Sequence, residues 1–196
     1  IIEFLKEEFN EPVYCNIEPI DYVARKDGSL KDKLEYYGNP DLYESDFFRF
    51  AEVSDMFIAG HFYAEGSPYL LTKEELANPK NKIKYIADIS CDIDGPIAST
   101  IRPSTIAEPF YGYLPGEHKE VNFNNPDAIA VMAVDNLPCE LPRDASHGFG
   151  EMFIEKIMPS FFNGDQSEVL LRGRITNKDG ELMPRFQYLT DYVNGK

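Results

Sequence analysis

Four short apolar runs, separated by polar sequence with helical patterns, are the feature that most constrains the fold of this chain. Their continuous apolar character and their β-branched and aromatic residues are typical of strands that are covered on both faces. Strands that alternate with helices predict an open α/β sheet that is mainly parallel. The four runs are residues 56–60, 83–90, 109–113 and 128–134, and residues 11–17 form a weaker fifth candidate.

Helix signals lie between and after these runs. The pair Asn39-Pro40 offers an N-cap and a first-turn proline, followed by aromatic residues at helical spacing up to Phe50. Thr72 and Glu75 fit a capping box. Apolar residues at helical spacing over 145–157 predict a longer helix that ends near Pro159, and residues 182–193 repeat the pattern. We therefore expect the last sixty residues or so to be helical.

Charge and cysteine content exclude several classes of protein. The net charge of −15 over 196 residues argues against nucleic acid and against an anionic membrane surface as partners, because both require basic patches. No apolar run approaches the length of a membrane-spanning helix, and no signal peptide is visible. Three widely spaced cysteines fit neither a zinc site nor a disulfide framework, so we expect no metal and a reducing, cytoplasmic location.

Polar residues follow three of the four predicted strands. The segments are "GHFY" at 60–63, "SCDIDG" at 90–95 and "DNLP" at 135–138. In open α/β sheets, ligands bind at the carboxyl ends of the strands, so these segments can line one crevice. Each segment also has an ordinary reading, since Asp, Asn, Gly and Ser are common in turns and Asp135-Asn136 can simply cap the next helix. For His61 we favour a surface or packed histidine over a catalyst. For Cys91 we favour a small buried residue over a nucleophile, because nothing near it in the sequence would lower its pKa.

Two phosphate-binding motifs are absent from the sequence. Neither G-x-G-x-x-G nor G-x-x-x-x-G-K-[ST] occurs, and the glycines of "HGFGEM" lie within a helical pattern and not after a strand. If the sheet binds a dinucleotide, the turn that holds its pyrophosphate is therefore missing from this chain. The chain also begins with Ile1 and not with Met, and we expect it to be part of a longer protein.

Two long motifs carry a specific resemblance: "ADISCDIDGPIASTIRPSTIAEPFYGY" and "VMAVDNLPCELPRDASHGFGEMF". Both resemble the lysine-forming saccharopine dehydrogenases and the lysine–ketoglutarate reductase half of aminoadipic semialdehyde synthases, in the alanine dehydrogenase/transhydrogenase superfamily. The segment "YYGNPDLYESDFFRFAEVSDMFIAGHFY" fits the same pattern, so the resemblance covers roughly residues 12–163.

The resemblance implies a Rossmann-like fold and a division of the chain. Residues 1–135 correspond to the later part of an NAD(P)-binding domain, and residues 136–196 to a helical segment that returns toward the substrate domain. In that family the glycine-rich turn, the first domain and the acid/base lysine and histidine lie upstream of the region that matches Ile1. We therefore expect no catalytic residue in this chain. The chain alone should be inactive, should bind dinucleotide weakly, and should need the missing N-terminal domain as its partner.

The resemblance also assigns binding roles. Ile89 and the segment from Val134 to Leu137 match positions that contact NAD or NADP, and Phe62 stands where relatives commonly carry a tyrosine near the cofactor. Ser90, Cys91 and Asp92 match the loop that lines the substrate beside the nicotinamide. The resemblance thus predicts two sets of residues: cofactor-binding Phe62, Ile89, Val134, Asp135, Asn136 and Leu137, and substrate-binding Ser90, Cys91 and Asp92.

Three functions remain open at this point. The leading one is an oxidoreductase acting on the CH–NH bond of saccharopine, which it interconverts with lysine and 2-oxoglutarate. The second is an alanine dehydrogenase-like enzyme acting on pyruvate and alanine. The third is a nucleotide-binding module without turnover, because fold alone does not fix function. We also expect the face that normally meets the missing half of the protein to carry apolar patches that promote self-association of this chain into a homo-oligomer.

Overall fold

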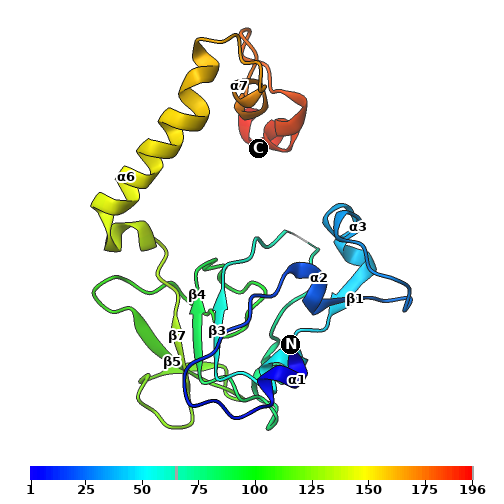
Figure 1. Cartoon of the computed structure of the whole chain (residues 1–196), viewed down its shortest axis with the longest axis vertical. Coiled ribbons are helices and arrows are strands. Elements are labelled where there is room, and N and C mark those ends of the chain that lie inside the picture. The colour runs from blue at the N-terminus through cyan, green and yellow to red at the C-terminus, as the bar shows by residue number, and fades with distance from the viewer. Residues whose placement is uncertain (65, 196) are drawn as a thin grey trace. The chain divides into compact units, whose positions relative to one another are not determined.

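The computed structural model describes residues 1–64 and 66–195, and these form two compact units (Figure 1). The first unit runs over Ile1–Glu140 and the second over Leu141–Lys196. Their correspondence to a nucleotide-binding domain and a returning helical segment stays a prediction.

A mixed five-stranded sheet in the order β3-β4-β7-β5-β6 forms the centre of the first unit. The strands β3 (Met56–Ala59), β4 (Tyr85–Asp88) and β7 (Ile129–Met132) run parallel to one another. The strands β5 (Phe110–Leu114) and β6 (Lys119–Val121) complete the sheet as an antiparallel hairpin beside β7. All four apolar runs are confirmed as strands, and the α/β class with a Rossmann-like partial sheet is confirmed. The parallel arrangement is confined to the three strands that carry the predicted site.

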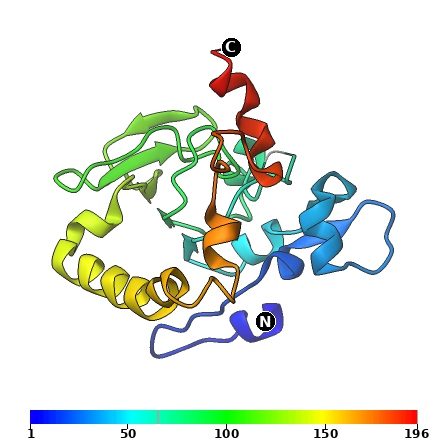
Figure 2. The same ribbon diagram turned by 90° about the horizontal axis from the view of Figure 1, so that it is seen from above.

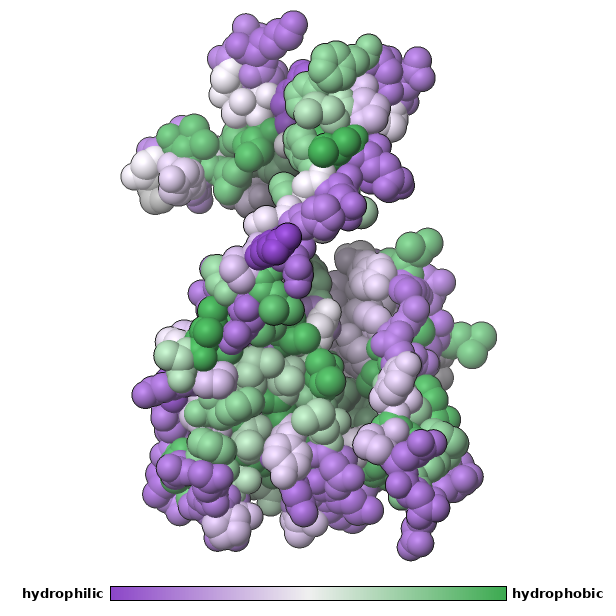
Figure 3. All heavy atoms as spheres, turned by 60° about the vertical axis from the view of Figure 1, so that its left-hand side comes forward, coloured by the Kyte–Doolittle hydropathy of each residue, from purple (hydrophilic) through white to green (hydrophobic). Residues whose placement is uncertain are grey.

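Within the described residues of the first unit, only one face of this sheet is covered. The register puts Phe57, Ile86, Val131 and Tyr111 in one row across the sheet, and these side chains pack in or against the core. The opposite face is open: its large side chains are 51–62% exposed, namely Met56, Ile58, Tyr85 and Phe110. The first unit by itself therefore does not cover the strands on both faces, as the apolar runs had led us to expect. Broad apolar surface is visible on the larger unit in Figure 3, where hydrophobic residues are green.

A second, two-stranded sheet corrects two expectations in the N-terminal part. β1 (Val23–Arg25) pairs antiparallel with β2 (Tyr43–Ser45), so the helix predicted from Asn39-Pro40 is instead a 3₁₀ turn, η1 (Pro40–Leu42), followed by a strand. The reason is tertiary: the hydroxyl of buried Tyr43 donates to Glu35 Oε2 at 2.6 Å. Residues 11–17 form no strand, and most of their side chains face solvent.

Short helices surround the sheets of the first unit. Thr72 caps α5 as the capping box predicts, with its hydroxyl accepting from the backbone nitrogen of Glu75. The helices of this unit are α1 (Ile2–Leu5), α2 (Pro19–Tyr22), α3 (Lys33–Gly38), α4 (Phe48–Ala51), α5 (Lys73–Leu76) and the 3₁₀ helix η2 (Leu137–Glu140).

The second unit is helical, as predicted. Its main element is α6 (Pro142–Met152), which starts at a proline and continues through a π-helical segment, η3 (Phe153–Ile157), into η4 (Met158–Phe161) (Figures 1 and 2). The tail differs from the single helix predicted over 182–193, because a kink at Phe186 interrupts η5 (Pro184–Leu189) and a separate short helix, α8 (Thr190–Val193), follows it. Between η4 and η5 the chain forms α7 (Val169–Gly173). Among the described residues no helix has the length and apolar character needed to cross a bilayer.

Candidate functional site

The carboxyl ends of β3, β4 and β7 meet at one edge of the sheet because the three strands are parallel neighbours. The backbone nitrogen of Ile89 donates to the carbonyl oxygen of Ala59 at 2.8 Å, which extends the β3–β4 pairing to this edge. The three segments that follow the strands begin at Gly60, Ile89 and Ala133. The three strand ends at which the sequence predicts a crevice therefore lie side by side.

Asp88, the last residue of β4, is buried to 1% exposure beneath the following loop. Its Oδ1 accepts from the backbone nitrogen of Cys91 at 3.1 Å, and its Oδ2 accepts from the hydroxyl of Thr100 at 2.6 Å. Sequence reasoning missed both side chains. The available signal was the single acid in the predicted strand 83–90, since a buried carboxylate requires partners.

Cys91 joins the β4 loop to the end of β7. Its backbone has a φ of 52°, in the left-handed region, and its thiol donates to the carbonyl oxygen of Ala133 at 3.2 Å. Burial raises the pKa of the Cys91 thiol, and the nearby carboxylates of Asp135, Asp88 and Asp92 raise that pKa further. A thiol in this setting stays protonated at neutral pH, so Cys91 acts here as a packing and hydrogen-bonding residue and not as a nucleophile.

Ser90 ties the same loop to the end of β3. Its hydroxyl donates to the carbonyl oxygen of His61 at 2.6 Å and lies 3.5 Å from His61 Nδ1. Burial lowers the pKa of His61, an effect that the charges of Asp88 and Asp92 oppose. Within the part of the chain that the structure describes, His61 Nε2 is buried without a hydrogen-bond partner. His61 is thus a packed, neutral histidine next to the predicted substrate loop.

The turn that closes the β4 loop requires glycine at position 95. The Gly95 nitrogen donates to the carbonyl oxygen of Asp92 at 3.0 Å. A Cβ atom on Gly95 would lie 2.6 Å from the Asp92 Cβ and 2.7 Å from that carbonyl oxygen. Asp94 has a φ of 51°, and its nitrogen donates to the carbonyl oxygen of Thr100 at 3.2 Å. The turn reading of this segment therefore holds, and the loop is fixed at both ends.

The predicted cofactor residues differ in what they expose at this edge. Phe62 is 92% exposed and Ile89 is 49% exposed, so each presents apolar surface. Val134 is buried and forms a parallel bridge with Ser104, which leaves its backbone as the means of any contact. Asp135 and Asn136 are exposed, and Leu137 begins η2. The structure brings Ile89, Cys91 and the Ala133–Val134 segment together, whereas ligand contact by all nine predicted residues stays a prediction.

Residues that would hold the pyrophosphate of a dinucleotide are not found at this edge. Among residues 1–64 and 66–195, no strand is followed by a glycine-rich turn into a helix. The exposed Asp135, the apolar surface of Ile89 and the backbone groups near Val134 instead fit the nicotinamide end of such a cofactor. In the described part of the chain, no group of three or more His, Cys, Asp or Glu side chains is placed to hold a metal ion.

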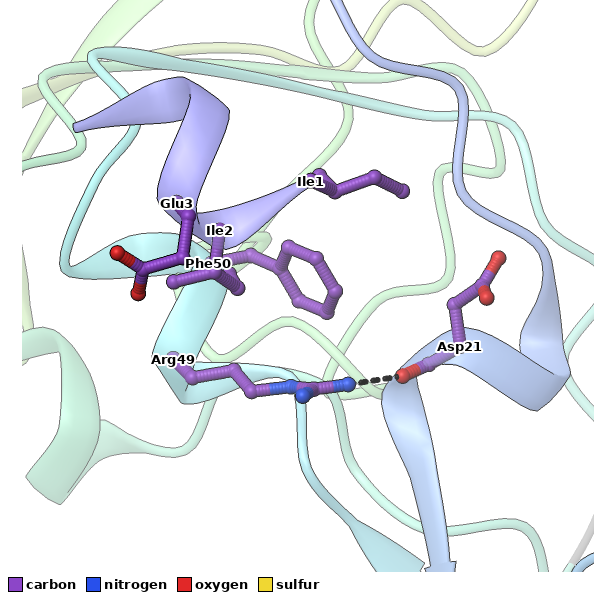
Figure 4. Close-up of a pocket in the computed structure, with 6 residues that line it drawn as sticks. All are labelled: Ile1, Ile2, Glu3, Asp21, Arg49 and Phe50. Atoms are coloured by element: carbon purple, nitrogen blue, oxygen red, sulfur yellow. Dashed lines mark hydrogen bonds between the residues drawn. The ribbon is translucent and has the colours of Figure 1, made fainter. Parts of the chain in front are cut away.

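A surface hollow of about 380 Å³ lies elsewhere on the first unit, around α1 and α4 (Figure 4). The guanidinium of Arg49 crosses it and donates to the carbonyl oxygen of Asp21 at 2.7 Å. The carboxylate of Asp21 accepts from the nitrogen of Glu18 at 2.8 Å and caps α2. Because Arg49 and Asp21 already have partners and the hollow involves none of the strand ends, it takes no part in the candidate site.

Comparison with known proteins confirms the resemblance seen in the sequence. No family model matches the chain. The chain is 29% identical over 183 residues to α-aminoadipic semialdehyde synthase of Arabidopsis thaliana, covering 89% of this chain and 17% of the synthase. It is 26% identical over 197 residues to the mitochondrial α-aminoadipic semialdehyde synthase of Rattus norvegicus, covering 86% of this chain and 21% of the synthase. It is also 27% identical over 171 residues to a saccharopine dehydrogenase [NAD(+), L-lysine-forming] of Candida albicans, covering 82% and 40% of the two chains.

These homologues identify the relationship but are much longer than the matched region. The chain spans about a fifth of the length of the synthases that it matches and well under half of the Candida albicans enzyme. Homology to saccharopine dehydrogenases and aminoadipic semialdehyde synthases places the chain among oxidoreductase relatives. It favours the saccharopine branch over an alanine dehydrogenase-like enzyme.

Proposed function

We propose that this chain forms part of an NAD(P)-dependent oxidoreductase that acts on the CH–NH bond of saccharopine. In the reaction, saccharopine, water and the oxidised dinucleotide give lysine, 2-oxoglutarate, the reduced dinucleotide and a proton. A hydride leaves the carbon beside the secondary amine, and water then cleaves the resulting C=N bond. The dinucleotide, when bound, accepts that hydride.

The observation that carries the proposal is the contact between the two motifs that resemble the family most. Cys91 lies in the first motif and Ala133 in the second, and the thiol of one donates to the carbonyl of the other. Ser90, Cys91 and Asp92 would then face the amino-acid substrate, while Ile89 and residues 134–137 would face the nicotinamide. Phe62 would contribute exposed aromatic surface at the same edge.

The chain's own task in this proposal is positioning. Exposed Asp135 and Asn136 offer acceptors and donors for the carboxamide or ribose, and Ile89 offers apolar surface for the ring. Holding the ring against the substrate carbon and excluding water would raise the rate of hydride transfer. We assign proton transfer to no residue of this chain and expect it from the N-terminal domain of the whole protein.

The test uses the uninterrupted natural protein. Oxidation of NADH and of NADPH is followed with lysine plus 2-oxoglutarate and, separately, with pyruvate plus ammonia. Turnover in the first mixture alone supports the proposal and identifies the preferred cofactor. Turnover with pyruvate alone would move the protein to the alanine dehydrogenase branch, and failure of both would favour the nucleotide-binding module.

The 196-residue chain alone should give little or no turnover and weak dinucleotide binding, because no pyrophosphate turn follows a strand within the described residues. Steady turnover by the purified chain would contradict this. A cytoplasmic location also remains part of the proposal, because three free cysteines fit a reducing compartment. The rat relative, however, is named as mitochondrial. Cell fractionation with antibody detection decides between these compartments.

A further inference from the structure

We infer that Asp88 is a positioning residue that holds the Ser90–Gly95 loop against the end of β7, and through it sets the substrate-binding surface. The identity of the ligand in this inference rests on the proposed function. The role of Asp88 in holding the loop rests on the geometry alone. Asp88 touches no exposed part of the site itself, since its side chain is buried beneath the loop.

Each oxygen of the Asp88 carboxylate accepts one hydrogen bond. Oδ1 accepts from the Cys91 nitrogen at 3.1 Å and Oδ2 accepts from the Thr100 hydroxyl at 2.6 Å. Thr100 is itself 0% exposed and lies twelve positions further along the chain. One buried acid therefore fastens the start of the loop to the segment that follows it. Burial of a carboxylate costs free energy, and this cost is offset only where the carboxylate accepts hydrogen bonds.

The loop needs such fastening because its backbone is strained. Cys91 and Asp94 both have positive φ values, 52° and 51°, which non-glycine residues adopt at a cost of about 1 kcal/mol or more each. Conformations of this kind persist when their surroundings fix them. The Asp88–Cys91 bond fixes the first strained residue, and the bond from Asp94 N to Thr100 O at 3.2 Å fixes the second.

The same arrangement connects the two predicted binding segments. With Cys91 held by Asp88, its thiol reaches the carbonyl oxygen of Ala133 at 3.2 Å. Ala133 is held in turn by Ser104, whose hydroxyl accepts from the Ala133 nitrogen at 3.0 Å and whose nitrogen donates to the Ala133 carbonyl at 2.8 Å. The path Asp88–Cys91–Ala133 thus relates the predicted substrate loop to the segment that starts at Val134.

The loop can be tested in the 196-residue chain through the reactivity of Cys91. Cys15 and Cys139 are replaced by serine, which leaves Cys91 as the only thiol of the chain. The rate of its reaction with Ellman's reagent is measured in Asp88→Asn and Thr100→Val. Thr100→Val removes one hydrogen bond to the buried carboxylate and should raise the population of the open loop, and with it the reaction rate, by about tenfold or more. Asp88→Asn removes the charge of the acceptor, which also lowers the pKa of Cys91, so a faster reaction is expected there too but the decision rests on Thr100→Val.

Two variants serve as matched controls. Thr100→Ser keeps the hydroxyl and should react at nearly the original rate. Ser99→Ala removes a hydroxyl that is equally buried but has no partner among the described residues, and it should also leave the rate unchanged. Thr100→Val keeps the carboxylate and so carries the test if Asp88→Asn fails to fold. Equal rates in Thr100→Val and in the parent chain would overturn the inference.

The effect of Asp88 on substrate binding is tested in the uninterrupted natural protein with the same substitutions. Asp88→Asn and Thr100→Val should raise the KM for saccharopine by about tenfold while kcat falls less, because the loop is loosened and no reacting group is removed. An active enzyme whose KM is unchanged would overturn the positioning role. If the natural protein does not turn over saccharopine at all, the proposed function fails, whereas the thiol rates still decide whether Asp88 holds the loop.

Discussion

The thiol of Cys91 and the carbonyl oxygen of Ala133 lie 3.2 Å apart, and this contact joins the loop after β4 to the segment after β7. The two strands are parallel neighbours, with Ala87 opposite Met132, so their ends come together at one edge. The thiol donates, and burial together with three nearby carboxylates keeps the proton on it. The contact accordingly depends on a protonated Cys91.

The first prediction concerns the reactivity of that thiol. Because burial raises the pKa of Cys91, its thiolate should appear at higher pH than that of an unburied thiol. Iodoacetamide at neutral pH should therefore label exposed Cys139 well before Cys91. Peptide mass spectrometry over a time course, repeated at several pH values, measures both rates. Faster labelling of Cys91 at neutral pH would contradict the assignment of a protonated, packed thiol.

The second prediction concerns Gly95. An alanine Cβ there would sit 2.6 Å from the Asp92 Cβ, so the turn must shift. We expect Gly95→Ala to lower the free energy of unfolding by about 1–3 kcal/mol, as for other overpacked sites. Gly60→Ala is the matched control, because it follows β3 at the same edge and an added Cβ meets nothing within 4 Å. Urea unfolding of both variants checks the prediction, and equal stabilities would contradict it.

The strands were predictable because their signal is local. Runs such as 128–134 are apolar throughout, and the strand β7 (Ile129–Met132) lies within that run. The region around Tyr43 was misassigned because its aromatic spacing fits a helix, whereas the pairing of Tyr43 with Arg25 is a tertiary contact. The open face of the sheet was missed for a related reason: an apolar run indicates burial but does not say which part of the chain provides the cover.

The location of the candidate site was predictable from the sequence, but the buried hydrogen bonds that hold its loop in place were not. Polar residues after three strands indicate one edge of the sheet as soon as the strands are parallel. Asp88 lies inside an apolar run, and its partner Thr100 is twelve positions away in the sequence, so nothing local indicates the bond. The turn that ends at Gly95 was readable from the sequence, whereas the close approach of Gly95 to the Asp92 Cβ depends on backbone conformation that the sequence does not state.

The third prediction is a dependence of stability on pH through His61. Burial lowers its pKa in the folded chain, whereas in the unfolded chain it keeps an ordinary value near 6.5. The unfolded state therefore binds the proton first as pH falls. The contribution of neutral His61 to stability is complete above about pH 6.5 and is lost as pH falls toward the lowered folded value. His61→Gln should remove this dependence. Urea midpoints between pH 5 and 8 measure it, and parallel curves for the two proteins would contradict the prediction.

The last prediction concerns the open face of the five-stranded sheet, defined by Met56, Ile58, Tyr85 and Phe110. Each of these side chains is more than half exposed, and β3 is an edge strand of the sheet. Contiguous apolar surface at a sheet edge favours association with another copy of the chain. We therefore expect the apparent mass of the 196-residue chain to rise with concentration in light scattering.

Charge on this face should abolish that rise. The double substitution Met56→Lys and Ile58→Lys places two cations on the edge strand, where the side chains are 55% and 62% exposed, so the fold should lose little stability. Leu30→Lys is the control, because Leu30 is 94% exposed and belongs to no strand. It should associate like the parent chain. A parent chain that stays monomeric at every concentration would contradict the predicted self-association. A double variant that associates as strongly as the parent would show that another surface causes it.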